Sequence, residues 1–363
     1  MMRLLVYVLS ILRWFVAPFV LIALGVYWLF LVVVFAPLIA FDAVFGWTRS
    51  RYANEPPAWA AIERSSTDVF DRHADVSKLT GCNTRNVRYR WTIFDHALKR
   101  IEERRKPIRA LDFGAGSLRD SFEMARRGYR VTAVDLNRET MRRHASAYEW
   151  NGTAGEPELI AGSLDDLGNR RFEVITAFDV IEHLEDLEQI IERLSSHLVA
   201  GGVLLVTVPN RRSFYERHNR IQIAMMRQIG IQWIPGEPHL NFRTPSEWRK
   251  TFERHGFTIG DHDMALGFLV NDACHTAFRI PLLWIVCPVL DRILSPFRGP
   301  LDRESFIRHF FPRWLVERID LVDRMTKPLL HGMFGWNLFV LERVSGHGPF
   351  PTSGACHGPE SCT

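Results

Sequence analysis

The chain has 363 residues, of which 47% are hydrophobic, 12% aromatic and 24% charged, and its formal net charge is +4. This length and apolar content permit a full hydrophobic core and exclude a disordered protein. The mild overall basicity argues against a nucleic-acid-binding protein. Five cysteines show neither C-x-x-C spacing nor a pairing pattern, and they predict reduced thiols in a cytosolic compartment.

The N-terminal segment is the most apolar part of the chain. From Trp14 to Phe41 it contains 28 residues without a charge, whereas a helix needs about 20 residues to cross the hydrocarbon of a bilayer. We therefore predict a membrane anchor over residues 1–47, followed by a basic helical linker and N-terminal helices over residues 48–107. Arginines on both sides of the span leave its orientation open.

From residue 108 onward, short apolar runs alternate with amphipathic helical patterns. The runs are IRALDF, YRVTAVD, PELIAG, FEVITAF and GGVLLVTVP. Near-continuous apolar strands between amphipathic helices indicate a parallel sheet that is covered on both faces. The sequence thus predicts an α/β fold, a doubly wound sheet over residues 108–266, with its ligands at the carboxyl ends of the strands.

The first two strands end in residues that suit a nucleoside. Gly114 and Gly116 follow the first strand, where glycines let the backbone approach a nucleotide closely. Arg119 stands where a dinucleotide site would have its third glycine. Asp135 ends the second strand, at a spacing where an acid would hold ribose hydroxyls. A nucleoside ligand is therefore favoured over a dinucleotide.

Five motifs in order resemble class I S-adenosylmethionine (SAM)-dependent methyltransferases, closest to the quinone-biosynthesis O-methyltransferase branch. They are D-x-G-x-G, VDLN, FEVITAFDVIEHLED, GGVLLVTVPN and HLNFRTPSEWRKTFERHGF. The resemblance covers about residues 85–265 and a final strand at 334–343. It implies a Rossmann-like, seven-stranded, mostly parallel sheet that binds SAM. The cofactor-binding residues that it implies are Asp112, Gly114, Gly116, Asp135, Leu136, Ser163, Leu164, Phe178 and Asp179.

The resemblance also implies a role for most of these residues. Asp112 would hold the methionine amino group, the two glycines would make room for the methionine, and Asp135 would bind the ribose. Ser163 and Leu164 stand where the family contacts adenine, and Phe178 and Asp179 would lie beside the sulfonium. Leu118 departs from the pattern, because the family often has a third glycine there.

Asp179, Glu182 and His183 follow the fourth strand. Apolar residues at helical spacing from Val180 predict one helix that ends at Gly201 and Gly202, with the three polar residues on the outer side of its first turn. Methyl transfer to a hydroxyl requires loss of its proton. His183 could take that proton as a base at neutral pH, or a divalent metal could lower the pKa of the hydroxyl.

The D-x-x-E-H pattern, together with the more distant His239, is similar to the metal-binding pattern of small-RNA 2′-O-methyltransferases. It implies Asp179, Glu182, His183 and His239 as ligands of Mg, Mn, Fe or Zn. Glu182, His183 and His239 are also the catalytic candidates. Three interpretations stay open: residues that only brace the cleft, a metal-free base or substrate orienter at His183, and a metal site.

The second half of the chain contains a helix start and an insertion. Thr244-Pro245-Ser246-Glu247 is a capping box that predicts a helix to about His255, before a strand near 258–265. Residues 267–333 are predicted to be an apolar helical insertion, either a lid, a membrane-lying element or an extra core layer. Residues 334–343 form the last core strand, and 344–363 a disordered tail.

The anchor and the apolar insertion predict an amphipathic or lipid-linked acceptor. A prenylated quinone precursor, a glycolipid and a polyprenyl-linked sugar all fit this description. O-methylation is the expected reaction, with C- or N-methylation of a lipid as one alternative and a non-catalytic SAM-binding membrane scaffold as another. Cofactor supply places the catalytic domain on the cytosolic side of the membrane. The expected partners are the bilayer and a hydrophobic substrate, without nucleic acid.

Overall fold

The computed structural model describes residues 81–150, 153–213, 216–217, 239–241, 243–265, 313–330, 332 and 334–343, together with Val33 and Pro37. These residues belong to two compact units. One unit comprises residues 91–208, 239–263 and 338–363, and the other comprises 1–90, 209–238 and 264–337.

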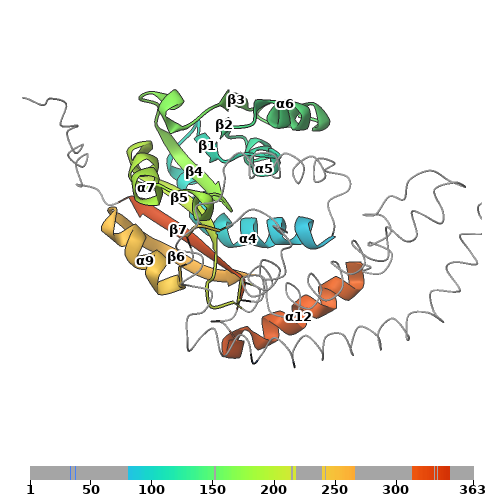
Figure 1. Cartoon of the computed structure of the whole chain (residues 1–363). Coiled ribbons are helices and arrows are strands. Elements are labelled where there is room, and N and C mark those ends of the chain that lie inside the picture. Colours follow the sequence, from blue (N-terminus) through green and yellow to red (C-terminus); the bar gives the residue numbers. More distant parts are fainter. Residues whose placement is uncertain are drawn as a thin grey trace, which may run out of the picture. The chain divides into compact units, whose positions relative to one another are not determined.

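A seven-stranded sheet forms the centre of the fold, with the strand order β3-β2-β1-β4-β5-β7-β6 (Figure 1). The pairs β1–β2, β1–β4, β2–β3 and β4–β5 are parallel. This arrangement confirms the predicted doubly wound, Rossmann-like α/β sheet. The strands are β1 (Arg109–Phe113), β2 (Arg130–Asp135), β3 (Glu158–Ala161), β4 (Phe172–Phe178), β5 (Leu198–Pro209), β6 (Phe257–Ala265) and β7 (Trp336–Arg343).

The strand order reverses between β1 and β4. The chain runs outward from β1 to β3 at one edge and then returns to place β4 on the other side of β1. In sheets of this kind the ligand binds at the carboxyl ends of the strands beside such a reversal. The ends of β1 and β4 therefore mark the place to look for a site.

Helices cover both faces of this sheet because its central strands are apolar on both sides. All seven residues of β4 are buried. α5 (Arg119–Arg126), α6 (Arg138–Ala147) and the part of α4 (Gly81–Arg104) from Trp91 onward lie on one side. α7 (Leu187–Ser196) and α9 (Pro245–Arg254) lie on the other side (Figure 1). Each helix buries its apolar stripe against the sheet.

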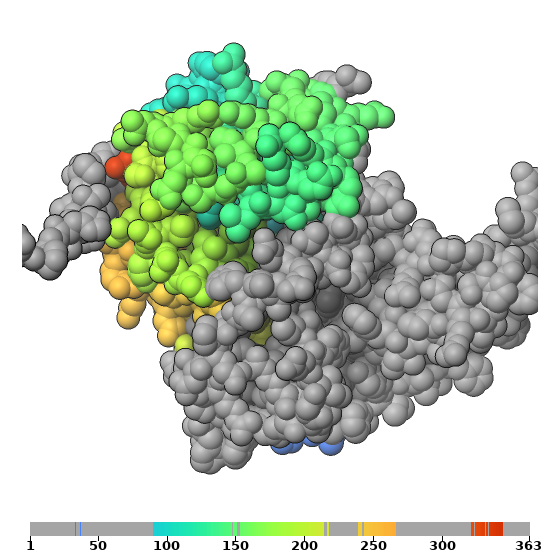
Figure 2. All heavy atoms as spheres, turned by 45° about the horizontal axis from the view of Figure 1, so that its top comes forward, coloured from blue at the N-terminus to red at the C-terminus, as the bar shows by residue number. Residues whose placement is uncertain are grey.

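The elements appear on the surface in the same order as the strands beside which they lie. On the face drawn in Figure 2, the teal-green residues of α6 and the orange residues of α9 lie apart, with green residues of the β4-to-α7 part of the chain between them. Beneath that surface, the largest group of buried apolar side chains joins β1, β4 and β5 to α7 and α9, and it includes Leu111, Ile175, Leu194, Leu204 and Phe252.

The other unit is described in part. It contains α12 (Arg313–Leu330), which falls within the predicted insertion at 267–333. Asn210 holds two of its segments together, since its side-chain amide donates hydrogen bonds to the carbonyl oxygens of Gly332 (3.0 Å) and Phe334 (2.9 Å). The insertion's role as a lid, a membrane-lying element or an extra core layer stays a prediction.

Several sequence predictions fall on residues that the structure does not describe. These are the anchor at 1–47 (apart from Val33 and Pro37), the linker at 48–80, the greater part of the insertion and the tail at 344–363. Within the described ranges, no helix combines the length and the apolar character that a bilayer crossing requires.

The single helix predicted from Val180 to Gly201 is wrong. The structure has a short 3-10 turn, η3 (Ile181–His183), then α7 over Leu187–Ser196, and β5 begins at Leu198. The break occurs because the carbonyl oxygens of Ile181 and Leu184 accept hydrogen bonds from the side chain of Asn241. Gly202 lies inside β5, where a Cβ atom would approach the carbonyl oxygen of Glu173 to 3.0 Å.

Candidate active site

The turn after β1 has the shape that the glycine pattern predicts. The backbone N–H groups of Gly114 and Ala115 both donate to the carbonyl oxygen of Val134 (2.8 and 3.1 Å), which ties the turn to β2. Gly114 has φ +73°, and a Cβ atom there would lie 2.3 Å from Cγ2 of Val180. Only glycine satisfies both conditions, so the turn packs directly against Val180, the second residue after β4.

Leu118 keeps this turn geometry without a third glycine. Its backbone is left-handed (φ 54°, ψ 17°), and it precedes the first residue of α5. Its N–H group donates to the carbonyl oxygen of Ala115 (2.8 Å), and its side chain is fully buried. Burial of the leucine offsets the cost of a conformation that glycine adopts without strain.

Asp112 is buried at the end of β1. Its Oδ2 atom accepts a hydrogen bond from the Ser121 hydroxyl (2.6 Å), and its Oδ1 atom accepts one from the Thr176 hydroxyl (2.8 Å). These bonds fix the orientation of a carboxylate that is only 3% exposed. This buried and oriented carboxylate is the group that the resemblance assigns to the methionine ammonium, with which it would form a charge-assisted hydrogen bond.

Asp135 connects two turns at the same edge of the sheet. Its Oδ2 atom accepts from the N–H group of Gly116 and its Oδ1 atom from that of Asn137, both at 2.9 Å. The side chain is partly exposed at the end of β2, where its remaining lone pairs suit ribose hydroxyls. Leu136 follows with 84% of its surface exposed, and it offers an apolar surface for a base.

Ser163 and Leu164 occupy a short 3-10 turn after β3, η2 (Leu164–Leu167). Ser163 is the N-cap of η2, and it forms a capping box with Asp166. Leu164 is only 1% exposed and packs into the main core. Its side chain is therefore directed into the protein, and only its backbone remains for the predicted adenine contact.

Phe178 is likewise a core residue. Its ring stacks on Phe94 of α4 at 5.4 Å and meets the edge of Trp91 at 5.7 Å, so that α4 covers the end of β4. Asp179 follows in a left-handed conformation (φ 61°), and its carboxylate accepts a hydrogen bond from the Thr207 hydroxyl. The contact with β5 directs the Asp179 side chain toward the sheet. The sequence pattern gave no signal for the contribution of Trp91 and Phe94.

Three of the four predicted metal ligands come together. One potential ligand atom from each of Glu182, His183 and His239 lies within 4.8 Å of the other two. The rings of His183 and His239 are 4.9 Å apart, and Nε2 of His183 is 3.9 Å from Oε1 of Glu182. Among the described residues, this group does not include Asp179. We call Glu182, His183 and His239 the acid–histidine triad.

The burial of the acid–histidine triad differs from the exposed helix face that the periodicity predicts. Glu182 is fully buried, whereas the side chain of His183 is 18% exposed. A buried carboxylate next to two imidazoles is typical of a site that binds a cation or exchanges protons. Mixed carboxylate and imidazole ligands suit first-row divalent metals.

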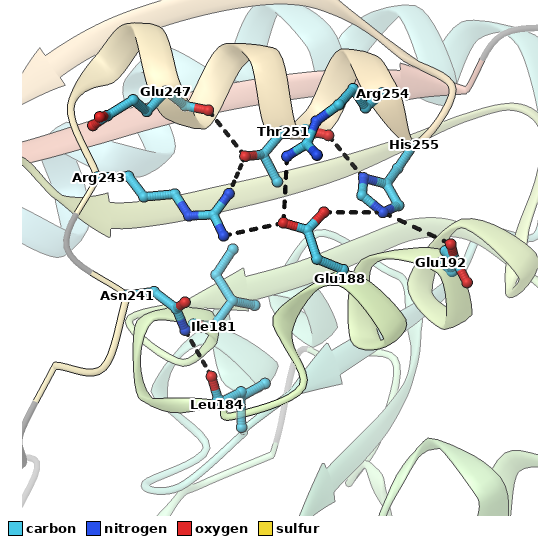
Figure 3. Close-up of polar contacts among 10 residues, drawn as sticks. All are labelled: Ile181, Leu184, Glu188, Glu192, Asn241, Arg243, Glu247, Thr251, Arg254 and His255. Carbon is cyan, nitrogen blue, oxygen red and sulfur yellow. Dashed lines mark hydrogen bonds and ion pairs between the residues drawn. The ribbon is translucent and has the colours of Figure 1, made fainter. Parts of the chain in front are cut away.

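The segment that carries His239 is joined to η3 by hydrogen bonds. The backbone N–H groups of Leu240 and Asn241 both donate to the carbonyl oxygen of Glu182, at 2.8 and 2.9 Å. The side chain of Asn241 points toward Leu184 in Figure 3 and donates to its carbonyl oxygen at 2.7 Å. Sequence reasoning missed Asn241, although it lies two residues after His239 and three before the capping box.

The chain is similar to known methyltransferases. Residues 84–261 match a family model described as a methyltransferase domain. A ubiquinone biosynthesis O-methyltransferase from Psychrobacter arcticus (strain DSM 17307 / VKM B-2377 / 273-4) is 30% identical over 185 residues, which cover 48% of this chain and 68% of that protein. The chain belongs to the class I SAM-dependent methyltransferases. SAM is the cofactor that the resemblance of the five motifs implies for this family, and the turn after β1 and Asp135 predict a site for its nucleoside part.

Other relatives of this methyltransferase match over less of their length. The protein of the same description from Caulobacter sp. (strain K31) is 29% identical over 149 residues, which cover 39% of this chain and 56% of that relative. Among solved structures, the 1,6-didemethyltoxoflavin-N1-methyltransferase of Burkholderia thailandensis is 16% identical, with a TM-score of 0.44. The matched region covers 80% of the present chain and 91% of the Burkholderia chain.

Proposed function

We propose that this methyltransferase transfers the methyl group of SAM to a hydroxyl oxygen, and that the acid–histidine triad binds a divalent metal at the acceptor. The observation that carries the proposal is the position of the triad. It begins three residues after Asp179, which follows β4 at the reversal of the strand order. A bound metal would hold the acceptor oxygen and lower its pKa.

The reaction is an in-line displacement at the methyl carbon. The bond between carbon and oxygen forms as the bond between sulfur and carbon breaks, and S-adenosylhomocysteine leaves. The hydroxyl proton must be removed. A metal held by the acid–histidine triad would let it pass to solvent by lowering the pKa of the hydroxyl, whereas in a metal-free site the partly exposed His183 imidazole would accept it. Asp112, Asp135 and the Gly114 turn hold the donor, so that the sulfonium faces the acceptor.

The proposed acceptor is amphipathic or lipid-linked. Two observations support this part: the 28-residue uncharged N-terminal segment, and relatives whose names place them in ubiquinone biosynthesis. We propose that residues 1–47 anchor the enzyme in a membrane and that its catalytic domain faces the cytosol, where SAM is supplied. A prenylated quinone precursor, a glycolipid or a polyprenyl-linked sugar has the required amphipathic character.

Chelation tests the role of the metal. Treatment of the full chain with excess chelator should abolish methyl transfer, and Zn²⁺, Mn²⁺ or Mg²⁺ should restore it. His239→Ala should be inactive at every metal concentration, whereas His96→Ala, which alters an exposed histidine of α4, should retain full activity. If wild-type activity survives complete chelation while His183→Ala is inactive, His183 acts as a base without a metal.

The acceptor can be identified in cells. The lipid extract of cells that lack the protein should contain a species lighter by one methylene than its counterpart in wild-type cells. Re-expression of the intact chain should remove that species, and the Asp135→Ala variant should not. If the two lipid extracts are identical, the lipid acceptor is excluded.

A further inference from the structure

Asn241 makes two hydrogen bonds that enclose Glu182 and His183. Its side-chain amide donates to the carbonyl oxygen of Ile181 at 3.1 Å. It also donates to the carbonyl oxygen of Leu184 at 2.7 Å, the contact drawn in Figure 3. Ile181 directly precedes Glu182, and Leu184 directly follows His183. One side chain thus binds the residue before and the residue after the two triad members of η3.

The chemistry of the site requires an amide at position 241. An asparagine amide has two N–H donors on one nitrogen, and both are directed at carbonyl oxygens here. If the amide group were rotated by 180°, its Oδ1 atom would face the two carbonyl oxygens, which are also acceptors. Aspartate has nearly the same shape as asparagine but has only acceptors when ionised, so it would meet both carbonyl oxygens with a negative charge.

The backbone beside Asn241 fixes the position of His239. The N–H groups of Leu240 and Asn241 converge on the carbonyl oxygen of Glu182. Four hydrogen bonds therefore join residues 240 and 241 to η3 and to Leu184 directly after it, and His239 immediately precedes these two residues in the chain. The imidazole of His239 lies against His183 with the ring centres 4.9 Å apart.

A separate ion-pair network joins the next elements. Glu188 of α7 pairs with Arg243 (3.0 Å) and with His255 (3.2 Å), as Figure 3 shows. This network links α7 to α9 without touching the carbonyl groups of η3. It therefore provides a control, since its removal loosens the neighbouring elements α7 and α9 but leaves the Asn241 hydrogen bonds in place.

We propose that Asn241 is a positioning residue that holds His239 beside Glu182 and His183, and thereby assembles the acid–histidine triad for metal binding. This inference rests on the proposed metal-dependent function, because its test measures metal binding. Asn241 itself touches neither cofactor nor acceptor in this role. It acts on η3 and on the backbone that carries His239, as second-layer residues do in metal sites.

The test compares Asn241→Asp and Asn241→Ala with Glu188→Gln in the full chain. Binding of Co²⁺ alone is followed by its absorption spectrum, and the affinity for S-adenosylhomocysteine and the melting temperature are measured alongside. Both Asn241 variants should weaken Co²⁺ binding about 10- to 100-fold, and their affinity for S-adenosylhomocysteine should be unchanged. Glu188→Gln should lower the melting temperature and leave the Co²⁺ affinity as in wild type.

The outcomes separate this proposal from the proposed function. Unchanged Co²⁺ affinity in both Asn241 variants, or an equal loss in Glu188→Gln, overturns the positioning role. If the wild type does not bind Co²⁺, the metal proposal fails, and the distance between the two histidine rings decides on Asn241. In the wild type, NMR should show nuclear Overhauser contacts between the His183 and His239 rings, and Asn241→Ala should remove them; contacts that persist in the variant contradict the proposal.

Discussion

Leu118 and His144 occupy positions that carry an energetic cost for their residue types. Glycine would adopt the backbone of Leu118 without strain, and an apolar side chain would be buried at position 144 without unpaired polar atoms. Leu118 adopts a left-handed backbone (φ 54°) and is fully buried. His144, in α6, is also fully buried, and neither of its ring nitrogens has a hydrogen-bond partner among the described residues. In both cases packing determines the residue, and a local preference is overridden.

The left-handed backbone at Leu118 should reverse a common order of stability. Glycine is about 1 kcal/mol worse than alanine inside an ordinary helix, but it avoids a strain of about 1–2 kcal/mol in the left-handed region. We therefore expect Leu118→Gly to be more stable than Leu118→Ala in urea denaturation. At Met124, a buried residue of α5, the alanine variant should be the more stable one. The same order at both positions would contradict the assigned backbone conformation.

His144 should weaken the fold at mildly acidic pH. Burial, and to a smaller extent the charge of Arg143, lower the pKa of His144 below its ordinary value of 6.5. As the pH falls through 6.5, the unfolded chain takes up a proton that the folded chain does not, so the free energy of unfolding decreases.

Replacement of His144 by leucine should remove this contribution. The free energy of unfolding of His144→Leu, measured in urea at pH 7.5 and at pH 5.5, should fall less between the two pH values than that of the wild type. The exposed residue His96 supplies the control, because His96→Leu should retain the wild-type difference. An unchanged pH dependence in His144→Leu would assign the acid sensitivity to other groups.

At the scale of elements, α9 places the segment that carries His239. Thr244 begins the helix with a capping box, in which its hydroxyl accepts from the Glu247 N–H group (3.3 Å) and its own N–H group donates to the Glu247 carboxylate (2.7 Å). The N-cap residue of α9 thus lies five residues after His239. This cap is the local feature that ends the segment.

Loss of the cap should destabilise the protein without affecting its cofactor site. Thr244→Ala should lower the free energy of unfolding by about 1 kcal/mol. Lys250→Ala, which changes an exposed side chain of the same helix, should shift it by less than about 0.5 kcal/mol. Equal stabilities of the two variants in chemical denaturation would show that the Thr244 hydroxyl contributes nothing.

The elements that the sequence predicted well are those determined locally. The capping box at Thr244 and the apolar runs of β1, β4 and β5 required no distant partner. The end of the helix predicted from Val180 could not be found in this way, because η3 is separated from α7 by hydrogen bonds from residues 240 and 241. These donors are more than 50 residues away in sequence.

The candidate site shows the same division. The spacing after β1 and β2 predicted Gly114, Gly116 and Asp135 as site residues. The pattern after β4, together with the distant His239, predicted the three residues that the structure brings together. Asp179 was grouped with the triad because the D-x-x-E-H pattern is similar to the metal-binding pattern of small-RNA 2′-O-methyltransferases. In the structure its carboxylate is bound by the Thr207 hydroxyl of β5, a strand neighbour that spacing alone does not reveal.

At the scale of the whole molecule, the donor site links the fold to cofactor binding. Asp135 joins the turns after β1 and β2 through its two hydrogen bonds, so a ligand bound at this carboxylate would contact both turns. A ligand that binds only the folded chain stabilises it by about 2.7 kcal/mol at a hundredfold excess over its dissociation constant.

S-adenosylhomocysteine should therefore raise the melting temperature of the wild type, and Asp135→Ala should abolish the increase. Removal of the carboxylate eliminates both the ribose acceptor and the hydrogen bond from Gly116. Asp261→Ala, at an exposed position in β6, should show the wild-type increase. A full increase in Asp135→Ala, measured by differential scanning calorimetry, would exclude Asp135 from the cofactor site.

The reversal of strand order between β1 and β4 separates two groups of site residues in the sequence as well as in the sheet. Every residue assigned to the ribose and the adenine lies before Arg171, and every member of the acid–histidine triad lies after it. A recombination event near the codon for Arg171 would therefore exchange the acceptor half while it retained most of the donor half. Such an enzyme can acquire new acceptors during evolution while the recognition of SAM stays the same.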